Sequence, residues 1–228
     1  MEHMNRPTLV KLFTGGHPFD QTSFQGLLDS LSDIDLSIME QPHGSESLAD
    51  EHQPLPQVLW FYDFAQQFST KSQQRLKSAI SQGMGLVVMH HAIYNHLEWT
   101  DYPHLIGGYY SMSRCEFNGV EIGPSTSVMA DMQVQILDRK HPITAGLTNF
   151  DLHDECYHQY YVSADIHPLL GTSHPMSHPF LAWTRSLGLG RIVYLQSGHG
   201  PSAFENQSFR IIVNRALLWA GESSPNRE

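Results

Sequence analysis

The most pronounced hydrophobic run in the chain is Gly85-Leu-Val-Val-Met89, which stops abruptly at His90 and His91. Consecutive apolar residues between a glycine and polar residues are typical of a strand buried on both faces, as in a parallel sheet covered by helices. The two histidines then lie at the carboxyl end of that strand. In open α/β sheets this edge binds ligands, because the loops that leave the strands diverge there. The pattern therefore predicts a histidine-bearing ligand site.

Two other apolar runs have the same design. Residues 8–13 precede His17, and residues 190–196 precede His199, each with glycines beside the histidine. Parallel strands bring their carboxyl ends to one edge of a sheet. We therefore expect three separate segments to bring histidines to a single rim.

The spacing of apolar residues along the chain switches between that of helices and that of strands. Apolar residues three and four positions apart predict helices, and alternating or continuous apolar residues predict strands. Helices are expected at residues 24–31, 69–82 and 209–217, and further strands at residues 34–39, 57–62, 132–137, 168–172, 180–184 and 191–196. The last two strands can pair as a hairpin. This order predicts an α/β fold with a doubly wound, mostly parallel sheet and helices on both faces.

Three regions lack such a pattern. Residues 41–56 are polar and contain several prolines, which predicts a loop. Residues 96–110 contain Trp99 and Tyr102, and their irregular spacing favours an aromatic-lined active-site loop over a helix. Residues 150–161 concentrate three acids and two histidines in a short span.

Composition narrows the function classes. The 228 residues suffice for one domain, with a core expected over about residues 8–220. A formal charge of −10, with only 13 Lys and Arg, argues against binding to nucleic acid. The N-terminus lacks the apolar core of a signal peptide, and no run of about 18 apolar residues could span a membrane. Because the two cysteines, Cys115 and Cys156, also fit a reducing compartment, we expect a cytoplasmic protein.

Histidine is unusually frequent. The chain has 15 histidines, more than the 13 Lys and Arg together. Histidine titrates near neutral pH and is the commonest metal ligand in proteins. The excess therefore indicates a functional use for some of these side chains.

Several short motifs occur in a characteristic order. They are Gly15-Gly16-His17, His90-His91, Trp99 with Gly107-Gly108, Asp154-Glu155-Cys156-Tyr157, Ala182-Trp183-Thr184, Gly190-Arg191-Ile-Val-Tyr194 and Gly198-His199. Together, over about residues 9–220, they resemble the ThuA-like (trehalose utilisation) family. The resemblance implies a flavodoxin-like fold similar to that of class I glutamine amidotransferases. It also implies a role in bacterial disaccharide use through 3-keto sugars.

One part of the amidotransferase site is missing. Those enzymes place a cysteine nucleophile where the strand turns into a helix, with a histidine base nearby. Here the corresponding segment is Met89-His90-His91-Ala92, without cysteine or serine, although His199 occupies a position similar to the amidotransferase histidine. Covalent acyl chemistry is therefore disfavoured, and we expect proton transfer or metal-assisted chemistry.

Two mechanisms fit the remaining residues. In one, a divalent ion such as Zn or Mn polarises a ketone oxygen and acidifies the neighbouring carbon. In the other, Glu155 or a histidine removes that proton, and a second histidine donates one to the leaving or ring oxygen. The expected metal ligands are His17, His91 and His199, with Asp154 or Glu155 supplying an oxygen. The expected catalytic residues are His91, Glu155 and His199, and the expected substrate-binding residues are His17, His90, Asn95, Trp99, Tyr102, Asp154 and Tyr157.

Some of these residues have a structural alternative. Strand alternation would send His90 and His91 to opposite sides, so one of them is expected to bond a backbone carbonyl, and His91 is favoured as the exposed one. Asp154 could cap a turn. Glu155 could pair with Arg114 or Arg191.

The sequence thus favours a cytoplasmic enzyme that acts on a small carbohydrate, a 3-keto glycoside or 3-keto disaccharide, by hydrolysis, elimination or isomerisation. The alternative is a non-catalytic sugar-binding or regulatory module on an amidotransferase-like scaffold. Neither hypothesis requires nucleic acid or a membrane as a partner, and both leave a homo-oligomer open.

Overall fold

A computed structural model describes residues 6–96 and 98–222 of the chain. Within them, nine strands form one mixed sheet in the order β2-β1-β3-β4-β13-β12-β11-β8-β9. The first five positions of this order hold strands that are parallel to one another, and antiparallel strands follow. The parallel strands are β1 (Thr8–Gly15), β2 (Ile34–Glu40), β3 (Val58–Asp63), β4 (Gly85–Met89) and β13 (Gly190–Leu195). The antiparallel strands are β8 (Thr126–Ile136), β9 (Phe150–His158), β11 (His167–Gly171) and β12 (Phe180–Leu187).

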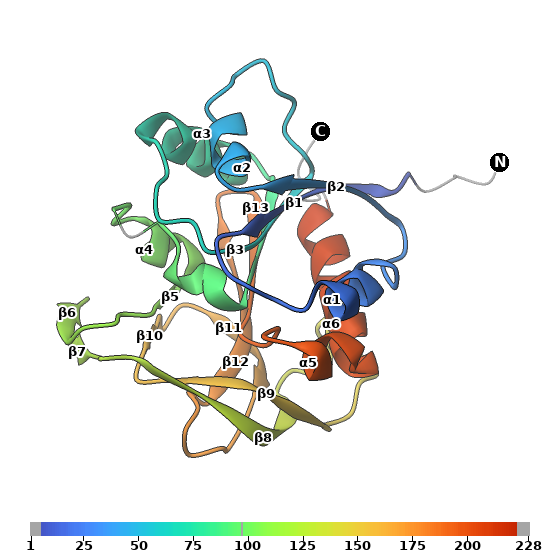
Figure 1. The fold of residues 1–228 in the computed structure, drawn as a ribbon, viewed down its shortest axis with the longest axis vertical. Helices are drawn as coiled ribbons and strands as arrows, with labels where there is room; N and C mark the ends of the chain where they lie inside the picture. The colour runs from blue at the N-terminus through green and yellow to red at the C-terminus, as the bar shows by residue number, and fades with distance from the viewer. Residues whose placement is uncertain (1–5, 97, 223–228) are drawn as a thin grey trace.

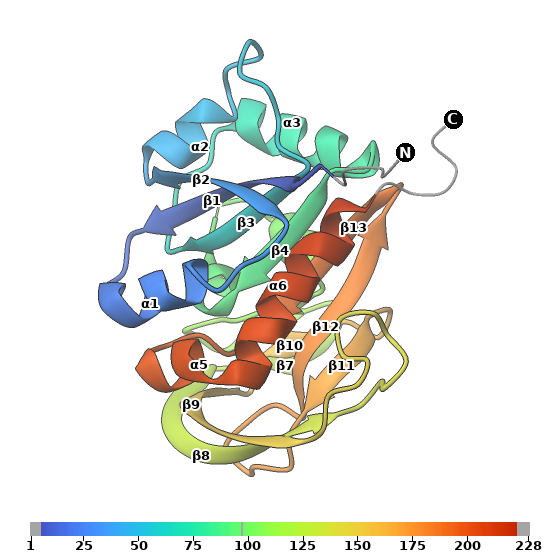
Figure 2. The same cartoon turned by 90° about the vertical axis from the view of Figure 1, so that its right-hand side faces the viewer.

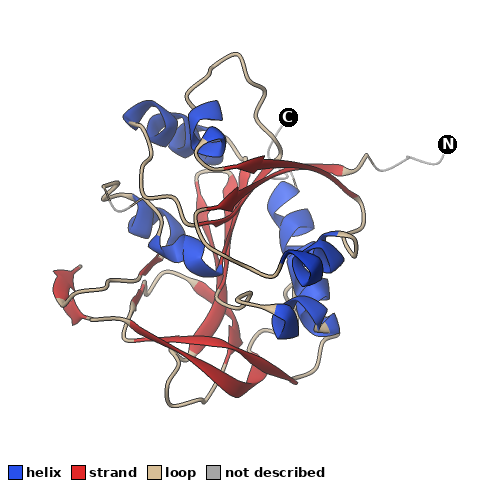
Figure 3. Ribbon diagram, viewed as in Figure 1, coloured by secondary structure: helices blue, strands red, loops and turns tan. Residues whose placement is uncertain are grey.

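Helices cover both faces of the parallel half (Figures 1 and 3). One face carries α1 (Gln21–Leu28), α5 (Pro201–Glu205) and α6 (Gln207–Gly221), and the other carries α2 (His43–Ser47), α3 (Thr70–Ser81), the 3₁₀ turn η1 (His90–Tyr94) and α4 (Tyr102–Ile106). Two hydrophobic cores, one on each side of the sheet, result from this arrangement. The predicted α/β class with a mostly parallel, doubly wound sheet is confirmed. None of the described helices is long and apolar enough to cross a membrane.

Two small antiparallel pairs lie outside the main sheet. They are β5 (Gly108–Tyr109) with β10 (Tyr161–Val162), and β6 (Cys115–Phe117) with β7 (Val120–Ile122).

Three predicted segments differ from the structure. Residues 41–56, predicted as a loop, contain α2. This short helix has no apolar pattern, and its Ser45 backbone N–H donates to the side chain of Gln41. Residues 96–110 contain α4, a helix of five residues that is too short to show a periodicity. Strand β8 begins at Thr126 rather than at residue 132. The sequence pattern missed its first half because that half is exposed and lacks the alternation of a half-buried strand.

The antiparallel half of the sheet curls back toward the parallel half. Strand β9 is four places away from β13 in the sheet order, yet Asp154 on β9 contacts the loop that follows β13. One carboxylate oxygen of Asp154 accepts a hydrogen bond from the Gly198 N–H at 2.7 Å, and the other accepts one from the His199 N–H at 3.1 Å. Strands β8 and β9 therefore pass below α5 and close the lower end of the molecule (Figures 1 and 2).

A second buried carboxylate lies at the end of β3. Asp63 is fully buried and accepts hydrogen bonds from the side-chain amides of Asn95, at 2.7 Å, and Gln41. The Asn95 side-chain oxygen in turn accepts from the Ala65 N–H at 3.0 Å. Burial raises the pKa of Asp63 to about 7, despite the hydrogen bonds that favour its charged form.

We expect Asp63 to make the protein less stable as pH rises. Its pKa is about 7 in the folded protein and 3.8 in the reference state, so between these values the folded protein binds more protons than the unfolded chain. Relative to Asp63→Asn, which cannot titrate, the free energy of unfolding of the wild type should fall by about 2–3 kcal/mol between pH 5 and pH 8. Urea unfolding at both pH values measures this difference. Asp35→Asn, at an exposed position on β2, should keep the wild-type pH dependence, and a constant difference between wild type and Asp63→Asn would contradict the prediction.

We also expect Asp154→Asn to destabilise the fold. An amide offers one acceptor oxygen, so either the Gly198 or the His199 N–H would face an NH₂ group in a buried place. The free energy of unfolding should fall by about 1–3 kcal/mol. Asp151→Asn, at an exposed position on the same strand, is the matched control and should leave the stability unchanged. Equal stability of the two variants would show that the carboxylate does not hold the loop.

Candidate active site

The two histidines after β4 enter the same site. His90 has a φ of +55°, in the left-handed region that residues other than glycine rarely adopt, and η1 begins at this residue. The chain therefore leaves strand geometry at His90, and the expectation that alternation separates the two side chains was wrong. His90 is fully buried, and a quarter of the His91 side chain is exposed, as favoured from the sequence.

The hydrogen bonds of His90 define which ring nitrogen carries its proton. Nδ1 lies 2.8 Å from the carbonyl oxygen of Gln196, and because a carbonyl can only accept, Nδ1–H is the donor. The predicted bond from one of the two histidines to a backbone carbonyl is thus present. In the neutral ring, Nε2 then carries a lone pair. It faces His199 Nδ1 at 3.1 Å and Glu155 Oε2 at 3.3 Å.

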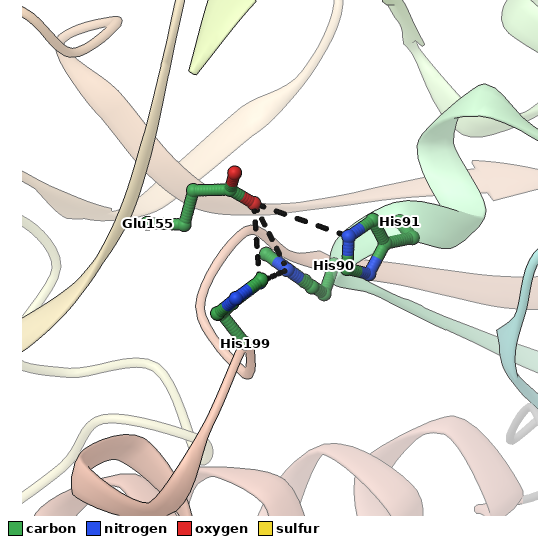
Figure 4. Close-up of side chains that lie close together, drawn as sticks. All are labelled: His90, His91, Glu155 and His199. Carbon is green, nitrogen blue, oxygen red and sulfur yellow. Dashed lines mark hydrogen bonds and ion pairs between the residues drawn. The ribbon is translucent and has the colours of Figure 1, made fainter. Parts of the chain in front are cut away.

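Glu155 connects the histidines. Its Oε2 lies 3.3 Å from His199 Nδ1 and 3.9 Å from His91 Nε2 (Figure 4). Burial disfavours the charged carboxylate. The hydrogen bond with His199 and the interactions with His90 and Ser127 outweigh burial and hold the pKa of Glu155 well below its usual range. Glu155 is therefore ionised at neutral pH.

The alternative ion pairs predicted for Glu155 do not form. Arg114 pairs with Glu121 at 3.0 Å, and Arg191 pairs with Glu222 at 2.7 Å. Both arginines are therefore engaged elsewhere. Glu155 instead points from β9 into the histidine cluster.

His199 is held from two sides. Its backbone N–H donates to Asp154, and its side chain contacts Glu155. These contacts come from one strand, because Asp154 and Glu155 are successive residues of β9 and their side chains point to opposite faces. The hydrogen bond to Glu155 raises the pKa of His199. Asp154, predicted to bind substrate, is buried and positions the loop of His199 instead.

His91 differs from His199 in its protonation. Burial is the largest of the effects that lower its pKa, and nearby histidines add to it, so the neutral imidazole is the form present at neutral pH. Its Nδ1 is buried without a hydrogen-bond partner among the described residues. A neutral, partly exposed imidazole beside a carboxylate can accept a proton from a bound molecule.

His17 lies behind His91 rather than within the cluster. The two rings are 4.5 Å apart between centroids, and His17 Nδ1–H donates to the Pro18 carbonyl at 3.2 Å. Burial lowers the pKa of His17. Among the described residues, the side chains that could share one metal ion are His90, His91, Glu155 and His199, with one ligand atom from each within 4.8 Å of the others. This set contains the predicted His91, His199 and Glu155, adds His90 to the predicted trio of histidines and leaves out His17.

A cleft of about 200 Å³ opens beside this cluster. Glu155, His91 and Tyr157 form part of its wall, and aromatic and apolar side chains, together with Ser127, form the rest. The remaining lining residues are Phe64, Ile93, Tyr94, Tyr110, Met112 and Ser127. Tyr157, predicted to bind substrate, also places its hydroxyl 3.1 Å from His90 Nδ1.

The aromatic lining was not predicted, apart from Tyr157. Phe64 and Tyr94 stack with their centroids 5.6 Å apart, and Tyr110 meets Tyr94 edge-on at 5.8 Å. Phe64 directly follows β3, so the rule that identified the histidines at strand ends could also have identified it. Tyr94 ends the short turn η1 and Tyr110 lies in a loop, and the direction of both side chains depends on tertiary packing.

The aromatic residues predicted for this role lie elsewhere. Tyr102 is fully buried, and its hydroxyl donates to the Ala92 carbonyl at 2.6 Å, so it cannot contact a ligand in this structure. Trp99 stacks on Phe68. Trp99 and Asn95 line a neighbouring cavity rather than the cleft. The local sequence pattern did not show that the segment with Trp99 and Tyr102 forms α4 in part and packs into the hydrophobic core on that face of the sheet.

Comparisons with known proteins agree with the fold and the motifs. A family model described as trehalose utilisation (ThuA) matches residues 22–220. A ThuA-like protein from Parabacteroides merdae is 16% identical, with a TM-score of 0.75 over 96% of this chain and 94% of that one. A ThuA-like protein from Bacteroides uniformis is 18% identical, with a TM-score of 0.69 over 94% of this chain and 91% of that one. A cytoplasmic protein from Salmonella typhimurium is 11% identical, with a TM-score of 0.65 over 93% of this chain and 98% of that one.

No curated protein matches the chain. At these identities the solved structures establish the fold alone, whereas the family model spans most of the sequence. The resemblance found in the motifs is confirmed, and the chain belongs to the ThuA (trehalose utilisation) family.

Proposed function

We propose that this protein is a carbohydrate-processing enzyme that acts on a 3-keto glycoside or 3-keto disaccharide. The family match links the chain to trehalose utilisation and hence to carbohydrates. The observation that carries the finer proposal is the position of His91 and Glu155 in the wall of an aromatic cleft. Aromatic faces stack on the apolar faces of pyranose rings, and the histidines and carboxylate beside them supply proton transfer.

A 3-keto sugar suits this site because the ketone makes the neighbouring C–H acidic. Removing the C2 proton places charge on the ketone oxygen, and the C1–oxygen bond to the leaving group can then break by elimination. The site must therefore provide a base and a positive centre. No nucleophile is needed, which agrees with a histidine rather than a cysteine at the strand end.

Two histidines divide these tasks. His91 is the base, because burial keeps its ring neutral and part of the ring is exposed to the cleft. His199, whose protonated form Glu155 stabilises, is the positive centre and returns a proton to the leaving oxygen. Elimination followed by addition of water gives net hydrolysis, so one set of residues serves either outcome.

The site of action is proposed to be the cytoplasm. Both cysteines are free thiols, as expected in a reducing compartment. The Salmonella typhimurium neighbour is described as cytoplasmic.

The decisive assay compares a 3-keto disaccharide with the same disaccharide unoxidised. Only the oxidised sugar should be consumed, since the unoxidised sugar has no acidic C–H. We expect His91→Ala and His199→Ala each to lower kcat by about 10²-fold or more, as the loss of a general acid or base typically does. His153→Ala is the matched control: His153 lies on β9, exposed and bonded to Asp131, and its loss should leave kcat unchanged.

Two outcomes would overturn the proposal. Turnover that survives in both His91→Ala and His199→Ala would remove these histidines from the mechanism. Calorimetric binding of the sugar with no product, with or without added divalent metal, would instead indicate a sugar-binding module without catalysis.

A further inference from the structure

We propose that His90, Glu155 and His199 bind one divalent transition-metal ion, with an open position toward the cleft. The binding is argued from these three side chains alone. The role of the ion rests on the proposed function, because a bound cation would supply the positive centre that His199 otherwise provides. His91, which takes the C2 proton, would then return that proton to the leaving oxygen. This set replaces the trio of His17, His91 and His199 expected from the sequence.

The spacing of the three ligand atoms fits a common ion. His90 Nε2, His199 Nδ1 and Glu155 Oε2 are 3.1, 3.3 and 3.3 Å apart. Ligands about 2.0–2.1 Å from a tetrahedral zinc ion lie roughly 3.3–3.4 Å from one another. By contrast, charge-assisted hydrogen bonds are typically about 2.7–2.9 Å long. The three separations thus match the spacing of ligands around one ion and are longer than typical charge-assisted hydrogen bonds.

Several lone pairs point into the cluster. His90 donates Nδ1–H to the Gln196 carbonyl, so its Nε2 points at Oε2 of Glu155, 3.3 Å away. His199 Nδ1 lies within 3.3 Å of both atoms, and the Tyr157 hydroxyl lies 3.3 Å from the same Nε2. A cation between the three ligand atoms would accept a lone pair from each.

The surroundings resemble the outer shell of known metal sites. Metal-binding histidines usually donate their other ring N–H to a carbonyl or carboxylate, which fixes the ring. His90 does so toward Gln196 and is fully buried. His199 is fixed through its backbone by Asp154. Two ligands are thus positioned without the ion.

The donor set indicates the class of ion. Two imidazole nitrogens and one carboxylate oxygen suit zinc, cobalt, manganese or iron rather than calcium or magnesium, which prefer oxygen ligands. Three protein ligands with one open position are typical of catalytic rather than structural zinc sites. When bound there, such an ion supplies Lewis-acid polarisation of a ketone oxygen. His91, whose Nε2 is 3.9 Å from Glu155 Oε2, stays free to act as the base.

Cobalt(II) binding to the full chain tests the proposal. Protein stripped with chelator is mixed with one equivalent of CoCl₂, and both the visible absorption of cobalt and the metal-to-protein ratio after gel filtration are measured. We expect one cobalt per chain in the wild type, and at least tenfold weaker binding in Glu155→Gln and in His199→Ala. His91→Ala and His153→Ala should bind as the wild type does. Near-ultraviolet circular dichroism confirms that each variant is folded.

Each result separates the metal from the sugar chemistry. Wild-type cobalt binding in folded Glu155→Gln and His199→Ala would show that other histidines hold the metal and would overturn the inference. So would loss of binding in His91→Ala, or a wild type that binds none. Cobalt binding at the three residues without turnover of a 3-keto sugar would support the metal site and refute the proposed function. Full turnover in chelator with no binding would do the reverse.

Discussion

The site depends on the hydrogen bonds that Asp154 accepts from the backbone of the loop after β13. They hold the edge strand of a nine-stranded sheet against the carboxyl ends of the parallel strands, four places away in the sheet order. Because side chains alternate along β9, the carboxylate that holds this loop is followed directly by Glu155, which points into the cleft. Strand β9 therefore provides both the carboxylate that holds the loop, Asp154, and the carboxylate that faces the cleft, Glu155. The buried Asp154 side chain keeps both backbone donors only while the sheet remains curled.

The second constraint is the backbone of His90. A non-glycine residue in the left-handed region costs about 1–3 kcal/mol and persists only where the surrounding structure holds it. Here the Gln196 carbonyl and the Tyr157 hydroxyl hold the ring. The same sharp turn after a central strand exposes the nucleophile in hydrolases with a strained strand-to-helix turn. In this chain the same kind of turn directs the His90 imidazole toward a carboxylate. A backbone turn that elsewhere presents a nucleophile therefore orients a histidine here.

Burial divides the histidines of the rim into different chemical roles. Burial keeps His91 neutral, whereas Glu155 favours the protonated form of His199. His17 packs behind His91 and supports its ring. Under the proposed mechanism, histidines with a similar sequence context thus serve as a base, an acid and a packing residue. Their difference comes from the position of one carboxylate and from the depth of each ring below the surface.

The local pattern of the sequence was enough to predict the parallel half of the fold. Continuous apolar strands such as Gly85–Met89 must be buried on both faces, and parallel strands bring their ends, with His17, His91 and His199, to one edge. The pattern could not show that His90 and His91 point the same way, because one backbone angle decides it. It could not show that Trp99 and Tyr102 pack inward while Tyr94 and Tyr110 line the cleft. Nor could it bring Glu155 to His199, since that contact requires the curl of a distant edge strand. Local periodicity reports which face of an element is buried, but only tertiary structure decides which distant elements meet.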